Sequence, residues 1–239
     1  MDPLDFLCWS FPKTDITFAA KKMQPLQDPL LVRMREQNSM THTVLKVGGS
    51  LIQVASHLIA CLCAAQVDAL VVPGGGPFAE TVRRFADRVD DATAHWMAVL
   101  AMNQYGFYLG TSGATLVEDL RALEPGICIL LPFKILYEHD PLPHSWEVTS
   151  DSIACWVAYE LHADLVIATD VDGIFSARGM TSRIAANELT SQTCVDAFLP
   201  QLLEKYSLNC TVVNGRHFER VIAAIQRRST IGTTIIGRK

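Results

Sequence analysis

The sequence lacks the features that would place the protein in a membrane or outside the cell. No apolar run in its 239 residues reaches the ~18 residues that a membrane-spanning helix needs. Residues 58–65, the best candidate, fit a helix of the protein core. No long apolar segment with a cleavage site marks a secretory signal. We therefore expect a cytoplasmic protein with no membrane partner.

The cysteines also lack the patterns of a metal or disulfide site. The seven of them form no CxxC pair, and no Cys or His residues have the spacing of a zinc site. Their number is odd and most stand in apolar patterns, as is typical of buried free thiols in a reducing compartment. We expect no metal site built from protein side chains alone.

A surplus of basic residues is missing as well. The formal net charge is −5, whereas a nucleic-acid-binding protein usually carries a basic face, so no nucleic-acid partner is expected. Hydrophobic residues make up 49% of the chain and charged residues 19%, which indicates a globular protein rather than a disordered one. The length suits one domain or two closely packed lobes.

Residues 1–39 have no regular hydrophobic period, because Pro3, Pro12, Pro25 and Pro29 interrupt every candidate pattern. The segment contains four aspartates, which argues against a transit peptide. We expect a poorly ordered extension without a functional role, followed by a folded domain over residues 40–239.

From residue 41 onward, strand-like and helix-like segments alternate. This alternation predicts an α/β fold, a three-layer αβα sandwich with a mostly parallel central sheet. Ligands of such sheets bind beyond the carboxyl ends of the strands. The predicted strands cover residues 44–47, 69–72, 127–131, 165–168, 211–213 and 233–236. The predicted helices cover 52–65, 92–108 and two stretches that begin at Pro77 and after Thr149, with a further one around 218–225 and a loop over 137–148.

Two glycine clusters follow the first two predicted strands. The first follows Lys46 and consists of Gly48 and Gly49 with Ser50, and the second is Gly74, Gly75 and Gly76. A strand, a glycine turn and a helix together present backbone N–H groups to an anion at the helix N-terminus. Either cluster alone would indicate only a turn, but the pair predicts two facing phosphate sites.

The order of four motifs resembles the amino acid kinase superfamily. The motifs are KVGGS at 46–50, PGGG at 73–76, TSD at 149–151 and TDVDG at 169–173. Further matches at 131–136, 144–146, 194–196 and 212–217 are similar to the branch that phosphorylates a furan-methyl phosphate in methanofuran biosynthesis. The resemblance covers residues 43–237.

The resemblance implies a small-molecule kinase that converts a furan-methyl phosphomonoester to its diphosphate with ATP. Mg²⁺ would be held through the ATP phosphates. It further implies an acceptor lobe over about 40–148, a nucleotide lobe over about 149–239, and a homo-oligomer.

The same resemblance assigns roles to individual residues. Lys46 would lie beside the transferred group, and Asp151 would organise the catalytic cations. The nucleotide would be bound by Gly48, Gly49, Ser50, Thr169, Asp170, Asp172, Gly173, Asn214 and Gly215. The acceptor would be bound by Gly74, Gly75, Gly76, Arg83, His144 and Trp146.

Each of these roles has a simpler alternative. Asp170 and Asp172 precede a glycine and are also common turn residues, and Asn214 also suits a capping turn. Arg83 is also consistent with a solvated helix position. The aromatic residues His144 and Trp146 would attract a cation or pack on the core.

The chain departs from the superfamily at one position of the predicted site. Related kinases carry a second lysine shortly after the Asp-Gly turn, but no lysine occurs between Lys134 and Lys205. Lys134, Arg178 and Arg183 are the candidate replacements, although arginine and lysine are not equivalent at such sites.

Two rival functions remain open at the level of the sequence. One is an isopentenyl phosphate kinase-like enzyme, but that family has a histidine shortly after the acceptor loop, where this chain has residues 77–80, PFAE. The other is a non-catalytic relative that binds nucleotide for storage or regulation.

Overall fold

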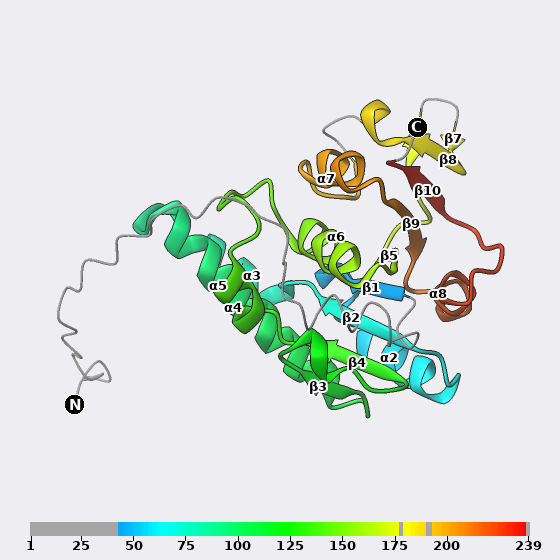
Figure 1. Ribbon diagram of the computed structural model, residues 1–239, viewed down its shortest axis with the longest axis horizontal. Coiled ribbons are helices and arrows are strands. Elements are labelled where there is room, and N and C mark those ends of the chain that lie inside the picture. The colour runs from blue at the N-terminus through cyan, green and yellow to red at the C-terminus, as the bar shows by residue number, and fades with distance from the viewer. Residues whose placement is uncertain (1–42, 177–178, 190–192, 238–239) are drawn as a thin grey trace, which may run out of the picture.

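The computed structural model describes residues 43–176, 179–189 and 193–237 (Figure 1). The expected extension at 1–39 and the candidate Arg178 lie outside these residues. Eight strands form one sheet in the order β3-β4-β2-β1-β5-β9-β10-β8. Their bounds are β1 Thr43–Val47, β2 Ala69–Pro73, β3 Thr115–Val117, β4 Ile127–Leu130, β5 Asp164–Thr169, β8 Arg183–Ala185, β9 Asn209–Asn214 and β10 Thr233–Ile236.

All neighbouring strands of this sheet run parallel except β9 and β10, which are antiparallel. A separate two-stranded sheet joins β6 (Phe175–Ser176) to β7 (Gly179–Met180). The mostly parallel sheet confirms the predicted fold class.

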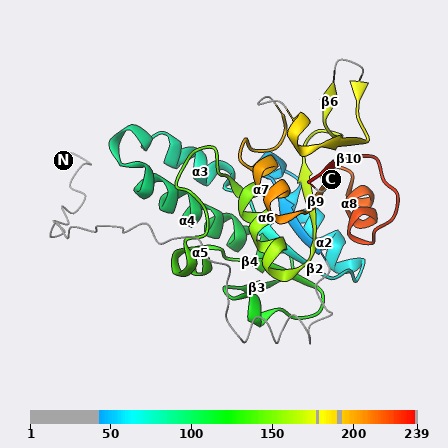
Figure 2. The ribbon, with the colours of Figure 1, turned by 45° about the horizontal axis from the view of Figure 1, so that its top comes forward.

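Helices cover both faces of the sheet, as Figures 1 and 2 show. Their bounds are α2 Ala55–Ala64, α3 Gly76–Arg83, α4 Asp91–Gly110, α5 Phe133–His139, α6 Ser150–Leu161, α7 Leu199–Tyr206 and α8 Phe218–Ile225. One apolar cluster joins α5, α6 and α7 to one face, and a second joins α2 and α8 to the other. The long helix α4 contributes to both clusters, with Trp96 in the first and Leu109 in the second.

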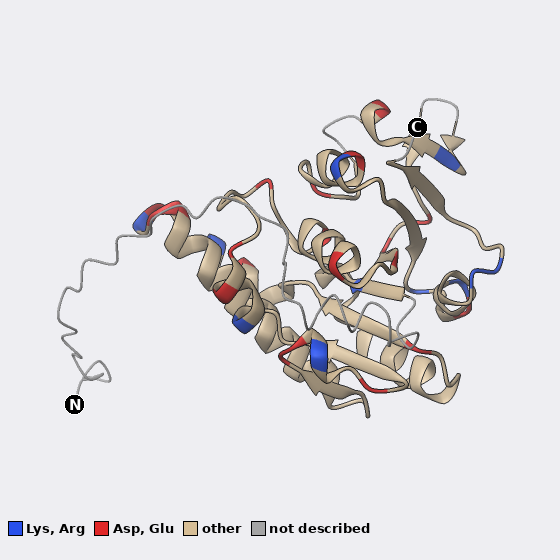
Figure 3. Cartoon of the chain, viewed as in Figure 1, with Lys and Arg blue, Asp and Glu red and all other residues tan. Residues whose placement is uncertain are grey.

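Neighbouring residues of the strands serve opposite faces, because side chains alternate along a strand. Val44 belongs to the first cluster and Leu45 to the second. A strand that is buried on both faces needs an almost continuous apolar sequence. This requirement explains why β2, β4, β9 and β10 contain no charged residue, so that the central strands are nearly without charge in Figure 3.

The structure adds elements that the sequence patterns did not predict. Residues 137–139 were expected in a loop but form the last part of α5, and α7 was not predicted. Both helices have at most eight residues, so each spans about two turns and shows only a weak period, although α3 and α8 of similar length were predicted. The strands β3 and β8 at the sheet edges, with three residues each, were also not predicted.

Two further observations concern the cysteines and the helices. The six described cysteines are free thiols, and Cys128, Cys155 and Cys210 are fully buried. Within the described ranges, no helix has the length and apolar character needed to cross a membrane.

Candidate active site

Four adjacent strands bring the predicted motifs together. Strands β2, β1, β5 and β9 are neighbours and parallel, so their carboxyl ends lie at the same edge of the sheet. Pro73 pairs with Val47, and Thr169 pairs with Asn214. The motifs that follow these strands therefore lie at the edge where ligands of parallel sheets bind, whereas the TSD motif at 149–151 begins α6.

The two glycine loops touch each other through their backbones. The Gly74 N–H donates to the Val47 carbonyl at 2.8 Å. A Cβ atom on Gly49 would lie 2.5 Å from the Gly76 Cα, which no side chain permits. Gly76 also has a φ of +53°, a conformation that glycine adopts without strain. The facing arrangement that the sequence predicted is thus present, and glycine is required for it.

Lys46 and Asp151 form a buried ion pair beside these loops. The Lys46 Nζ lies 2.8 Å from the Asp151 Oδ1, and the two residues are only 8% and 3% exposed. Asp151 stands in the first turn of α6, which Thr149 caps as predicted and where the helix dipole favours a carboxylate. Burial raises the pKa of the Asp151 carboxyl, and the Lys46 ammonium opposes this rise.

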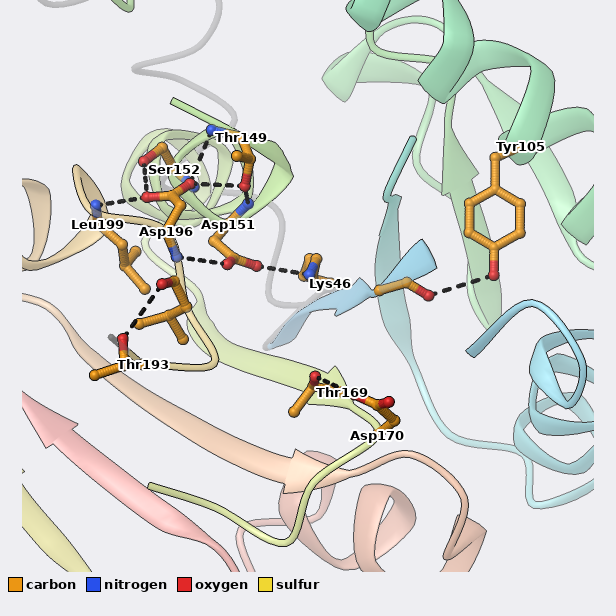
Figure 4. Close-up of polar contacts among 12 residues, drawn as sticks. Lys46, Tyr105, Thr149, Asp151, Ser152, Thr169, Asp170, Thr193, Asp196 and Leu199 are labelled. Carbon is orange, nitrogen blue, oxygen red and sulfur yellow. Dashed lines mark hydrogen bonds and ion pairs between the residues drawn. The ribbon is translucent and has the colours of Figure 1, made fainter. Parts of the chain in front are cut away.

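Asp196 holds the start of α6, although the sequence patterns assigned it no role. Its Oδ2 accepts hydrogen bonds from the Thr149 N–H and Oγ1 at 2.9 Å and from the Ser152 N–H at 3.0 Å. Its Oδ1 accepts from the Ser152 Oγ and from the Leu199 N–H, both at 2.7 Å. The Asp196 N–H donates to the Asp151 Oδ2 at 3.0 Å (Figure 4). Asp196 therefore joins α6 to α7 and helps to orient Asp151.

A cavity of about 530 Å³ opens beside the ion pair and the glycine loops. Its lining includes Lys46, Gly49 and Ser50, together with the predicted acceptor residues Gly75, Gly76, Arg83 and Trp146. The other walls are largely apolar, with Val99, Met102, Val148 and Ile153 among them. This volume suits a small organic molecule.

Of the two predicted aromatic residues, only Trp146 lines the cavity. The ring of His144 instead stacks on His95 with centroids 4.4 Å apart, and its Nε2 lies 2.8 Å from the Asp140 Oδ1. His95, which the sequence did not single out, lines the cavity. His144 thus supports the wall of the cavity from behind.

The predicted nucleotide residues other than the first glycine loop lie at the ends of β5 and β9, on the side of β1 away from β2. The Asn214 Nδ2 donates to the Asp172 Oδ1 at 2.9 Å, and the Arg220 Nη1 donates to the same oxygen at 2.6 Å. These two bonds lower the pKa of the Asp172 carboxyl. The Gly215 N–H donates to the Thr169 carbonyl at 2.7 Å, which ties the two turns together, while Asp170 is exposed.

The glycines Gly215 and Gly173 pack tightly against neighbouring segments. A Cβ atom on Gly215 would lie 2.3 Å from the Leu51 Cδ1, so the turn packs directly on the first glycine loop. A Cβ atom on Gly173 would lie 2.6 Å from the Thr233 Oγ1. Gly173 therefore allows close packing against the start of β10.

Two of the three candidate replacements for the second lysine lie in the described residues, and both are away from the cavity. Lys134 is exposed on α5, and Arg183 is exposed on the edge strand β8. Neither residue lines the cavity. In the part of the chain that the structure describes, no three His, Cys, Asp or Glu side chains are grouped to hold a metal ion.

Comparisons with known proteins agree with this geometry. Residues 114–199 match the model of the amino acid kinase family. The chain is 36% identical over 210 residues to the [5-(aminomethyl)furan-3-yl]methyl phosphate kinase of Methanocaldococcus jannaschii, a match that covers 81% of this chain and 97% of that protein.

Solved structures show the same fold at lower identity. The uridylate kinase of Archaeoglobus fulgidus has a TM-score of 0.62 and 19% identity, over 82% of this chain and all of that one. An isopentenyl phosphate kinase in complex with its substrate has a TM-score of 0.54 and 20% identity, over 82% of this chain and 100% of its own.

Proposed function

Because this chain is a kinase that belongs to the amino acid kinase family, we propose that its acceptor is a furan-methyl phosphomonoester, which it converts to the diphosphate with ATP. The support for this acceptor is the 36% identity to a kinase named for such a substrate. The product would serve the biosynthesis of methanofuran.

The observation that carries the proposal is the position of the Lys46–Asp151 pair. It lies where the two glycine loops meet and borders the acceptor cavity. Transfer between two phosphates depends on bringing the anions together and neutralising their charge. In this proposal Lys46 stabilises the transferring group, while Asp151 fixes the ammonium in place.

The two phosphates would use opposite sides of this junction. Gly48, Gly49 and Ser50, with the turns at Thr169 and Asn214, would bind the nucleotide. Gly74, Gly75 and Gly76 would bind the acceptor phosphate, and Arg83, which lines the cavity and is paired with Glu80, would contact the rest of the acceptor. In this proposal the acceptor lobe covers about 40–148 and the nucleotide lobe about 149–239, and the first glycine loop of the acceptor lobe also contacts the nucleotide.

The residues present fit a magnesium ion that arrives with ATP. Mg²⁺ is usually bound by one or two carboxylates together with substrate phosphates, and the described residues offer single carboxylates, Asp151 and Asp170, rather than a closed ligand cluster. When bound, the ion would neutralise charge on the phosphates. Cytoplasmic location and self-association belong to the same proposal.

The test is a turnover assay on the full chain. The protein is incubated with ATP, Mg²⁺ and either [5-(aminomethyl)furan-3-yl]methyl phosphate or isopentenyl phosphate, and ADP release is followed. The diphosphate product is identified by ³¹P NMR. We expect turnover with the furan phosphate at a kcat/KM far above that with isopentenyl phosphate.

Two outcomes would contradict the proposal. Preference for isopentenyl phosphate would move the chain to that acceptor. ATP binding without turnover of either ester would favour the non-catalytic, nucleotide-binding alternative.

A further inference from the structure

The acceptor cavity has two chemically different ends. One end presents Lys46 and the backbone of the two glycine loops, which suits a phosphate. The other end contains Glu80, Arg83, His95 and Trp146. His95 stands ten residues, or about 15 Å, along α4 from Tyr105, whose hydroxyl contacts the Gly48 carbonyl of the first glycine loop. The acceptor named in the proposed function also has two ends, a phosphate and an aminomethyl group that is an ammonium at neutral pH.

His95 has hydrogen-bonding capacity that the described residues do not use. Among them, neither ring nitrogen of His95 has a hydrogen-bond partner, and the residue is only partly exposed. A ligand in the cavity, which His95 lines, would supply a partner.

The orientation of the His95 ring is fixed. Its face stacks on His144 at an interplanar angle of 16°, and its edge meets Trp96 with centroids 4.9 Å apart. His144 is itself held by Asp140. A ring positioned in this way loses little freedom when a ligand binds, which favours affinity.

The ring is also in the protonation state that accepts a hydrogen bond. Burial, with a smaller effect of His144, lowers the pKa of His95 to about 4, so the imidazole is neutral near pH 7. A neutral imidazole has one lone pair that accepts, whereas an ammonium has only donors.

The surrounding charges and rings favour a cation at this end. Arg83 is paired with Glu80 at 3.1 Å, so these two charges offset each other. A small side cavity of about 30 Å³ shares His95 and Trp146 with the main cavity and adds Asp91, an acidic residue. The Arg83 guanidinium lies 6.0 Å from the Trp146 ring centroid, at the outer limit of a cation–π contact.

We propose that His95, together with the ring of Trp146, binds the ammonium group of the acceptor and thereby selects aminomethyl furan phosphates over furan phosphates without an amine. This assignment rests on the proposed function and names the recognition element within its site. His144 is a positioning residue in this proposal, since it touches His95 and does not line the cavity.

The test compares two acceptors that differ only in the amine. The full chain is assayed with [5-(aminomethyl)furan-3-yl]methyl phosphate and with (5-methylfuran-3-yl)methyl phosphate. A hydrogen bond to a charged group predicts a kcat/KM preference of about 10- to 100-fold for the amine. In His95→Phe, which keeps an aromatic ring for the stack, we expect the preference to fall below about threefold, mainly through a higher KM for the amine.

His57→Phe is the matched control, because His57 is exposed on α2 and the same chemical change there should leave the preference intact. Equal kcat/KM for the two acceptors in the unaltered chain would overturn the assignment while leaving the kinase function in place. An unchanged preference in His95→Phe would overturn it too. If neither acceptor is turned over, the proposed function fails, and this assignment fails with it.

Discussion

At the scale of single residues, Lys46 is an isolated charge in an otherwise apolar sheet. It is the only charged residue in β1. The neighbouring strand β2 has no charged residue, and β5 has only Asp164, at its far end. Its partner Asp151 is equally buried. A buried pair of this kind contributes little to stability by itself, but the loss of one partner leaves the other charge uncompensated.

Lys46→Ala is therefore expected to abolish transfer and to destabilise the fold without preventing it. The loss of stability should be about 3–5 kcal/mol, because Asp151 is left buried without a counter-charge. ADP release and urea denaturation would measure the two effects. The double variant Lys46→Met with Asp151→Asn should recover stability and remain inactive, so an active form of either variant would refute the role of Lys46.

Asp196→Ala is expected to lower both stability and kcat, because five donors at the starts of α6 and α7 lose their acceptor. We expect a loss of about 1–3 kcal/mol from each buried group left unsatisfied, partly recovered by water. The control variant is Asp164→Asn, which breaks an exposed ion pair with Arg227. This change should lower the free energy of unfolding by at most about 1 kcal/mol. Equal effects of the two changes would argue against the role of Asp196.

The sequence patterns gave no role to Asp196 or His95. Asp196 lies 45 positions after Asp151, and no local pattern shows that its carboxylate reaches the N-terminus of α6. His95 is likewise brought against His144 only by the fold. Lys46 and the glycines were identifiable because their chemistry lies in consecutive residues.

At the scale of elements, the contact between the glycine loops can be tested with two neighbouring substitutions. Gly49→Ala is expected to separate the loops, because its Cβ would overlap the Gly76 backbone. Gly48→Ala is milder, since its nearest contacts would be 3.2 Å to the Ala168 carbonyl and 3.3 Å to the Lys46 Nζ. Overpacking typically costs about 1–3 kcal/mol, so Gly49→Ala should show the larger loss in thermal denaturation and in kcat.

Similar stability and activity of the two glycine variants would contradict this account of the loops.

The sequence predicted that the two glycine loops face each other, but it did not predict their direct contact. Two glycine clusters after parallel strands indicated that the loops share one edge, but their direct backbone contact depends on the register of β1 and β2, which pairs Val47 with Pro73.

At the scale of the whole molecule, the site residues that the structure describes lie between Lys46 and Arg220. Removal of residues 1–39 is therefore expected to leave kcat and both KM values within about twofold of those of the full chain, a change that corresponds to less than 1 kcal/mol. Steady-state kinetics of the truncated and full chains would measure this. A large change in either KM would show that the segment takes part in binding.

The overall architecture was the most predictable property, because alternating buried strands and amphipathic helices leave few arrangements other than a layered parallel sheet. The antiparallel strand β10 and the short edge strands were not predictable in the same way. Their pairing is set by long-range contacts, such as those of Ile235 with Cys210 on β9.

The direct backbone contact between the two glycine loops has a consequence for how such a scaffold can diversify. In the proposed function, the separation of the two anions would be set by main-chain geometry, with no side chain as a spacer between the loops. The outer wall of the cavity comes from other segments, namely α3, α4 and the loop that precedes α6. That wall could be exchanged to admit a new ester while the spacing of the reacting groups stays constant, which would make acceptor choice and transfer distance separately adjustable.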